Sequence, residues 1–173
     1  MTDRPEPWLR GPLPGIPGLL QPVGHAFVMS MEDVAAAVAN LGPDELWLEP
    51  GGVASVGFHL AHLSGSTDRL LTYARGDSLS ETQRSLLARE GAIATIRPPL
   101  ADLIMLWRTT VTGALDQLSS TPEASLSQPR EVGRARLPST VLGLLFHAAE
   151  HASRHTGQLV TTSKLVRGAR GRR

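Results

Sequence analysis

Residues 147–158 read HAAEHASRHTGQ and contain three histidines at intervals of four positions. Four residues make slightly more than one helical turn, so neighbouring members of the series project from one face of a helix, about 6 Å apart. Far upstream, residues 57–63 read GFHLAHL and contain two more histidines. If both segments are helices that face each other, their imidazoles can converge on one metal ion in the core of a helix bundle.

Geometry alone leaves the set of converging histidines open. His147 and His155 lie about 12 Å apart along a helix axis, too far for both to reach one ion comfortably. The pair is therefore either His147 with His151 or His151 with His155. His59 and His62 are three positions apart, and either could point inward. Two histidines four apart also occur by chance, so a structural or surface position is the alternative to metal binding.

The composition is typical of one compact domain that needs no disulfides. The chain has 173 residues and no cysteine, and a chain of this size can bury about 70% of the surface that its unfolded form exposes. Without cysteine there is no thiolate ligand, no thiol nucleophile and no disulfide. Imidazole and carboxylate groups are left to bind a metal.

The charge pattern argues against nucleic acid and membranes as partners. The net charge of +1 gives no general attraction to nucleic acid, although residues 167–173 form a locally basic C-terminal tail. No apolar run approaches the roughly 20 residues needed to cross a bilayer, and the first residues, MTDRP, lack the pattern of a signal peptide. We therefore expect a soluble, cytoplasmic protein, with nucleic-acid binding through the tail as a weak alternative.

Residues 1–22 are predicted to form an extended arm ahead of the helical part of the chain. They contain six prolines and three glycines, which remove backbone donors and favour turns. Large apolar residues in the same stretch predict that the arm packs on the body of the protein: Trp8, Leu9, Leu13, Ile16, Leu19 and Leu20.

Residues 23–166 are predicted to form an all-α four-helix bundle. Apolar residues at helical spacing predict four long helices, over 23–41, 54–75, 99–119 and 138–166. Ser55 is a possible cap of the second helix and Gly76 its stop, and Ser80 with Gln83 shows a capping-box pattern. Pro138 suits the first position of the last helix, and no stretch shows the alternation of a strand. The second and third helices are joined by more than twenty residues that include a short helix over 80–90. This long crossover allows the two helices to run parallel.

The two histidine motifs resemble those of the DinB-like family of four-helix-bundle metalloproteins. In that family one metal-binding histidine lies on the second helix, and two lie in a histidine-x-x-x-histidine motif before a glycine–glutamine pair on the last helix. GFHLAHL and HASRHTGQ match this pattern, and the likeness spans most of the chain from about residue 22. The resemblance selects His62, His151 and His155 as ligands. Thr156 stands where the family often has arginine, so a charge role does not carry over there.

The resemblance implies a metal-dependent enzyme, either a thiol-dependent transferase or a hydrolase, although many family members have no assigned activity. Three neutral imidazoles suit one divalent ion, zinc or nickel, and leave one position open. The reactive group would be a metal-bound water or the thiolate of a low-molecular-weight thiol cosubstrate, acting on a small-molecule substrate. The resemblance also suggests a homodimer. The alternative is a non-catalytic metal-binding or stress-response protein.

Five further polar residues could contact the ligands or the substrate: His59, His147, Gln158, Arg69 and His25. Each also has a simpler interpretation, and neither His59 nor His147 is expected to be a primary ligand. His59 could be a partly exposed surface histidine, and His147 is better explained as a core histidine one turn from the site. Gln158 could pack on a neighbouring helix, and Arg69 could form an ion pair with an acidic residue. Nothing in the spacing of His25 demands a role at the site.

Overall fold

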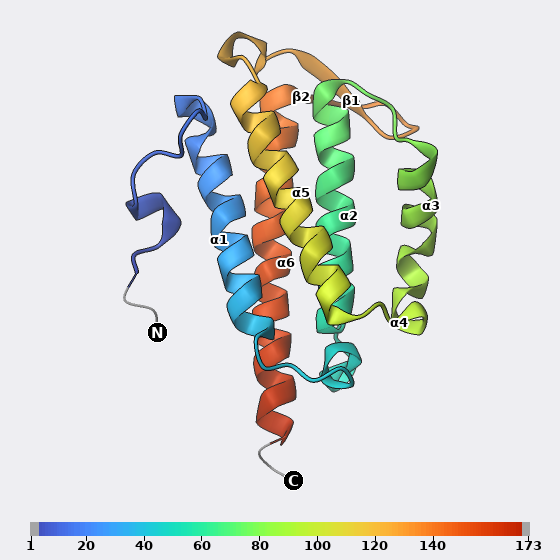
Figure 1. Ribbon diagram of the computed structural model, residues 1–173. Helices are drawn as coiled ribbons and strands as arrows, with labels where there is room; N and C mark the ends of the chain where they lie inside the picture. The colour runs from blue at the N-terminus through green and yellow to red at the C-terminus, as the bar shows by residue number, and fades with distance from the viewer. Residues whose placement is uncertain (1–3, 171–173) are drawn as a thin grey trace.

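The computed structural model describes residues 4–170, and four long helices make up its body (Figure 1). These helices are α1 (Gln21–Val38), α2 (Val56–Arg75), α5 (Leu100–Ser120) and α6 (Val141–Arg170). The connection between α2 and α5 carries α3 (Glu81–Arg89), the 3₁₀ turn η5 (Glu90–Ala92) and α4 (Ile93–Ile96). The remaining elements are the 3₁₀ turns η1 (Pro7–Leu9), η2 (Gly18–Leu20), η3 (Glu45–Trp47), η4 (Pro50–Gly52) and η6 (Glu123–Ser125), and the strands β1 (Pro129–Val132) and β2 (Leu137–Thr140).

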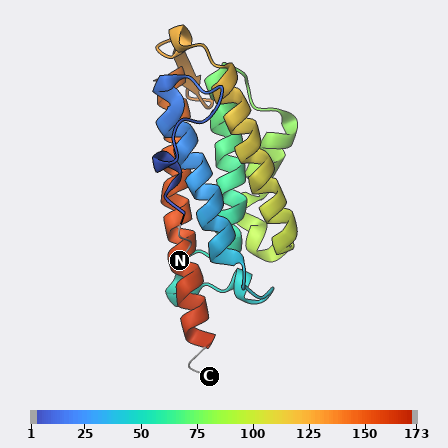
Figure 2. The ribbon, with the colours of Figure 1, turned by 60° about the vertical axis from the view of Figure 1, so that its left-hand side comes forward.

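The four long helices form a bundle in which α6 and α5 each pack against both α1 and α2. The long crossover, with α3 and α4 alongside α2, returns the chain to the end where α2 begins, so α2 and α5 run parallel (Figures 1 and 2). The helices α1 and α6 run in the opposite direction. The predictions of an all-α bundle and of a long crossover between its second and third helices are confirmed.

The core contains large apolar side chains from all four long helices. Those that are most completely buried include Phe27 and Val34 of α1, Leu60 and Leu63 of α2, Trp107, Val111 and Leu118 of α5, and Leu145 and Leu159 of α6. Full burial of one such side chain contributes about 1.5–3 kcal/mol. The bundle therefore has an apolar core of its own, against which a polar site can be positioned.

Local signals place the ends of α2 and α3 where the sequence predicted them. The Oγ of Ser55 accepts a hydrogen bond from the backbone of Phe58 (3.1 Å) at the start of α2. Gly76 ends that helix with a φ of 86°, a left-handed conformation that glycine adopts without steric cost. Ser80 and Gln83 form the reciprocal capping box at the start of α3.

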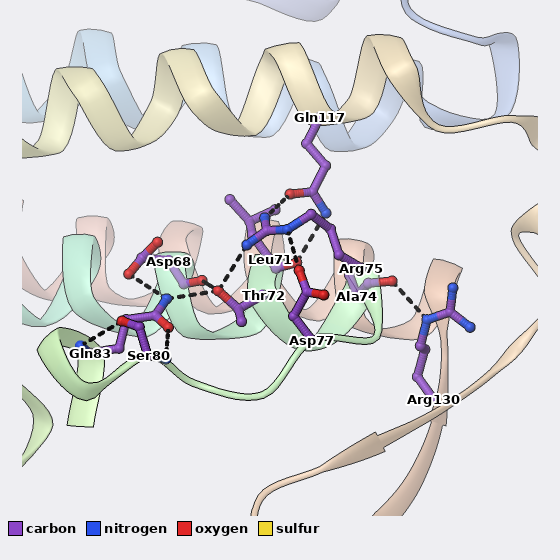
Figure 3. Close-up of polar contacts among 10 residues, drawn as sticks. All are labelled: Asp68, Leu71, Thr72, Ala74, Arg75, Asp77, Ser80, Gln83, Gln117 and Arg130. Carbon is purple, nitrogen blue, oxygen red and sulfur yellow. Dashed lines mark hydrogen bonds and ion pairs between the residues drawn. The ribbon is translucent and has the colours of Figure 1, made fainter.

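The structure adds a small sheet that the sequence did not indicate, and it moves the start of the last helix. Strands β1 and β2 form a small antiparallel hairpin, and Pro138 lies in β2, so α6 begins three residues later, at Val141. Neither strand, PREV or LPST, alternates apolar and polar residues, which is the pattern that identifies a strand in a sequence. Gly133 turns the chain between the strands with a φ of 68°, and Arg130 fixes the hairpin to the end of α2 by donating to the carbonyl of Ala74 (2.9 Å; Figure 3).

The limits of the first and last long helices, α1 and α6, also differ from those predicted. Helix α1 covers residues 21–38, not 23–41, and α6 continues to residue 170, beyond the predicted end at 166. Packing explains the extension, because Val166 is buried and Arg167 donates to the carbonyl of Ala37 on α1 (3.1 Å). The expected basic tail therefore begins as helix, and its residues 171–173 lie outside the described part of the chain.

The N-terminal arm, described from residue 4, lies along α1 (Figure 2). Arg10 forms a two-pronged ion pair with Glu32 of α1 (2.6 and 2.7 Å), and Ile16 is buried in the core. The predicted packing is thus confirmed in part. Three of the apolar residues expected to pack are largely exposed instead: Trp8, Leu9 and Leu19.

The crossover lies on α2 through few contacts. At its start, the amide of Gln83 donates to Asp68 Oδ2 (2.8 Å) and Thr72 Oγ1 (2.7 Å), as Figure 3 shows. None of the residues in α3, η5 or α4 is fully buried.

Within residues 4–170, no helix combines the length and the hydropathy that crossing a bilayer requires.

Candidate metal centre

Three histidines from two helices converge between α2 and α6. His62 of α2 and His151 and His155 of α6 each offer a ring nitrogen, and these three nitrogens lie within 4.8 Å of one another. The Nε2 atoms of His62 and His151 are 2.9 Å apart. The ring centroid of His155 lies 4.4 Å from that of His62 and 4.5 Å from that of His151. The structure thus brings together the three histidines that the motif resemblance selected.

Small residues on α6 allow the imidazoles to meet. Ala148, Ala149 and Ala152 are buried around the histidine-bearing turns, and α6 packs extensively on α2. Short side chains at a helix contact reduce the distance between the helix axes. The four-residue spacing then directs His151 and His155 to the same face. The site is therefore a property of the α2–α6 interface.

The two α6 imidazoles remain neutral well below physiological pH. Burial, together with repulsion from the neighbouring imidazoles, lowers the pKa of His151 to about 4. Burial and the proximity of His62 and His59 lower the pKa of His155 to about 4. Neutral imidazoles have a lone pair to donate to a metal ion, whereas protonated ones do not.

Glu90, which the sequence analysis did not identify, contacts the third histidine. Its Oε1 atom accepts a hydrogen bond from Nδ1 of His62, and its Oε2 atom lies 3.0 Å from the guanidinium of Arg69. Burial raises the pKa of Glu90, but the hydrogen bond with His62 and the charge of Arg69 outweigh this and leave the pKa below its usual value. Arg69, a candidate for substrate binding, instead forms an ion pair with an acidic residue.

His59 is buried beside His155. It is only 5% exposed, and its Nδ1 atom lies 3.2 Å from Nδ1 of His155. Burial lowers the pKa of His59, and the proximity of His62 adds to this effect. The interpretation of His59 as a partly exposed surface residue was therefore wrong. His59 therefore contacts His155, one of the three converging histidines, and this contact restricts the orientation of the His155 ring.

His147 lies at the surface, so its interpretation as a core histidine was wrong. Its side chain is 51% exposed, and Nδ1 lies 3.3 Å from the carboxylate of Glu150. Glu150 also pairs with Arg154 one turn further along α6. His25 contacts the arm, with Nε2 3.0 Å from the carbonyl of Gly11.

Thr156, the departure from the family pattern, faces away from the cluster. It is buried, and its hydroxyl lies 2.5 Å from that of Ser30 on α1. The residue therefore belongs to the α1–α6 interface, although it follows His155 directly in the sequence.

A groove adjoins the histidine cluster on the side of His155. It has a volume of about 770 Å³ and lies between the start of α2 and the second half of α6. Its walls include His59, His155 and Phe58, and the exposed side chains of Arg154 and Gln158 border it. The groove is large enough for a small organic molecule. Gln158 therefore lies at the edge of this groove.

The donor set fits one divalent ion. Three nitrogen donors within 4.8 Å of one another need only small shifts to lie at the 2.0–2.1 Å that is typical of zinc–nitrogen bonds. Phe58 stacks on His62 with an interplanar angle of 6° and a centroid separation of 5.7 Å, which restricts rotation of that ring. Three ligands from two helices leave part of a tetrahedral coordination shell to an external group.

Comparison with known families agrees with this architecture. The DinB superfamily model matches residues 26–159, which include all three converging histidines. The chain therefore belongs to the DinB superfamily. No curated protein matched its sequence.

Proposed function

We propose that the protein is a divalent-metal-dependent enzyme that acts on a small molecule, as a thiol-dependent transferase or as a hydrolase. The observation that carries the proposal is the convergence of three imidazoles beside a groove of substrate size. His62, His151 and His155 would hold one ion, zinc or nickel. An ion held in this way would act as a Lewis acid and lower the pKa of a water or thiol at the remaining position.

The residues of the groove favour the transferase over the hydrolase. In metalloproteases a glutamate acts as general base toward the metal-bound water, and the described residues that line the groove include neither Asp nor Glu. A thiol needs only to lose its proton to become a nucleophile. Because the chain has no cysteine, that thiol would come from a low-molecular-weight cosubstrate. His59 and Gln158 would contact the substrate or the cosubstrate.

Metal analysis combined with an activity screen tests this function. Purified protein is loaded with Zn²⁺ or Ni²⁺ and assayed with electrophilic substrates, with and without a low-molecular-weight thiol. We expect turnover that requires both metal and thiol, that is lost in His151→Ala and that is retained in His147→Ala. Turnover of esters or amides without thiol would identify a hydrolase instead. Stoichiometric metal binding without turnover of either substrate class would favour the non-catalytic alternative.

We also propose that the protein is a homodimer, as the resemblance suggested. Leu142 and Phe146, four residues apart on α6, are both exposed, at 38% and 60%. Exposed apolar side chains on one helix face are typical of a contact surface. A monomeric mass in light scattering at micromolar concentration would contradict the proposal.

A further inference from the structure

Glu90 reaches the candidate metal centre from a segment outside the bundle. It lies in η5, in the middle of the crossover, yet its side chain is only 15% exposed, similar to His62 (19%) and Arg69 (14%). The two carboxylate oxygens have different partners: Oε1 is bonded to His62 and Oε2 to Arg69. A partly buried carboxylate whose two oxygens both have polar partners is held in position more firmly than the carboxylate of an exposed residue.

The backbone of α2 provides space for this arrangement at Gly65. A Cβ atom added there would lie 2.9 Å from Arg69 Nη1 and 3.8 Å from Glu90 Oε2. Glycine inside a helix costs about 1 kcal/mol relative to alanine, so its presence there calls for a packing reason. The ion pair of Arg69 with Glu90 occupies the volume that a larger residue would fill.

The hydrogen bond with Glu90 determines which nitrogen of His62 is free. An ionised carboxylate can only accept, so Nδ1 of His62 carries a proton, and in the neutral form of the ring the lone pair is then on Nε2. Nε2 is the nitrogen that faces His151, at 2.9 Å. Carboxylate partners of this kind orient metal-bound histidines and strengthen them as donors.

We propose that Glu90 is a positioning residue for the metal centre, and that metal binding and docking of the crossover on α2 stabilise each other. This inference rests on the proposed metal site of His62, His151 and His155. Glu90 is not one of the three converging residues and does not line the groove. It acts by holding His62 in the tautomer and orientation that the ion requires.

The coupling follows from the contacts that attach the crossover, which include the partly buried Ile93 and Ala94 of α4, packed on the core, and a few polar contacts. Since α3, η5 and α4 contain no fully buried residue, Glu90 and Gln83 provide polar anchors on α2, the second through Asp68 and Thr72 (Figure 3). An ion that favours the oriented form of His62 favours the docked form of the segment that orients it. Docking of the crossover also strengthens metal binding, and by the same free energy, because coupling between two binding equilibria is reciprocal.

The experiment compares Glu90→Ala and Glu90→Gln with a matched control, Glu81→Gln. The control removes a carboxylate from an exposed position of the same crossover. Glu90→Gln keeps an oxygen that can accept from Nδ1 but loses the charge that pairs with Arg69. Three quantities are measured in the full-length protein: Zn²⁺ affinity by chelator competition, the tautomer of His62 by ¹⁵N NMR without metal, and hydrogen exchange of residues 81–96 with and without Zn²⁺.

We expect Glu90→Ala to weaken Zn²⁺ binding about 10- to 100-fold, the range found for carboxylates behind metal-bound histidines. Glu90→Gln should lose less and should keep the Nδ1-protonated tautomer, and Glu81→Gln should bind like the parent. Zn²⁺ should slow exchange over residues 81–96 in the parent and less so in Glu90→Ala. A merely structural role of Glu90 would change stability without changing the tautomer of His62.

Two results would overturn the inference. One is Zn²⁺ affinity in Glu90→Ala within twofold of the parent, with equal protection of the crossover in both metal states. The other is a parent protein whose metal-free His62 carries its proton on Nε2. If the parent binds no divalent ion, the proposed function fails, but the tautomer measurement still decides the positioning role of Glu90. If the parent binds Zn²⁺ and Glu90→Ala binds equally well, only the inference about Glu90 fails.

Discussion

Helix α6 carries polar side chains on two of its packed faces, fully buried toward α1 and partly buried toward α2, and their contacts differ. Toward α1, the hydroxyl of Thr156 contacts that of Ser30 (2.5 Å), and Ser163 donates to the carbonyl of Ala37 (2.7 Å). Toward α2, His151 and His155 meet other imidazoles, and burial together with repulsion between the rings when protonated lowers both pKa values to about 4. The first face pairs donors with acceptors, as a stable interior requires. The face toward α2 instead brings several imidazoles together, as a ligand-binding site does.

The comparison predicts its largest effect for substitution of an imidazole that converges on the site. His151→Ala should weaken Zn²⁺ binding by more than about 100-fold, since loss of an orienting partner alone costs 10- to 100-fold, and His62→Ala and His155→Ala should behave alike. Calorimetry or chelator competition measures the affinity. Thr156→Ala, adjacent to His155 but facing α1, is the matched control and should bind as the parent does. A His151→Ala affinity within tenfold of the parent would show that the cluster is not the metal site.

The second prediction concerns acid, in the metal-free protein. His151 and His155 have a pKa of about 4 in the folded state and about 6.5 when unfolded. Between these values the unfolded state binds more protons, so stability should fall as the pH decreases from about 6.5 to 4 and should not change through these groups above 6.5. Denaturant midpoints measured across this range test the prediction. The double variant His151→Ala/His155→Ala should show a flatter profile, whereas an unchanged slope would contradict it.

A smaller effect, confined to stability, is expected on the α1 side. Ser30→Ala leaves the hydroxyl of buried Thr156 without its partner, which should cost about 1–3 kcal/mol of unfolding free energy. Zn²⁺ affinity should stay within twofold of the parent. Adding Thr156→Val removes the stranded hydroxyl and should restore much of the loss. If Ser30→Ala weakens metal binding as strongly as His151→Ala, the two faces of α6 are not independent.

The smallest effects are expected for the two histidines beside the cluster. His59→Ala should keep a metal stoichiometry near that of the parent and lose at most about tenfold in affinity, because His59 contacts His155 (3.2 Å) as an orienting group. His147→Ala should change neither quantity, since its side chain is half exposed. Elemental analysis of both variants provides the measurement. Loss of the ion in His59→Ala comparable to that in His62→Ala would reassign the ligand on α2.

The sequence predicts best what local rules determine. The cap at Ser55, the left-handed turn at Gly76 and the capping box at Ser80 depend on neighbours within a few positions, and the structure has all three. The convergence of His151 and His155 follows from helical spacing in the same way. Each step of four residues also turns a helical position by about 40°. Two such steps separate His147 from His155, so His147 points away from α2 and lies at the surface. This rotation is the reason why the interpretation of His147 as a core histidine was wrong.

What the sequence could not predict depends on contacts across long separations. Glu90 lies 28 positions from His62, in a connector whose path no periodicity describes, and one carboxylate among many carries no signal of its own. The hairpin that includes Pro138 depends on the turn at Gly133 and on the bond from Arg130 to the end of α2. Burial of His59 likewise depends on how closely α6 packs against α2. The small alanines of α6 permit this close packing, but it exists only in the assembled bundle.

The separation of 89 positions between His62 and His151 sets the order of events during synthesis. A ribosome adds about 5–20 residues per second, so His62 emerges roughly 4–18 s before its first partner on α6. During that interval the nascent chain presents isolated imidazoles, which compete poorly for an ion that cellular ligands already hold. An ion at the proposed site would therefore be acquired by the finished bundle, and its identity would depend on which metal is available at that moment as well as on the geometry of the three histidines.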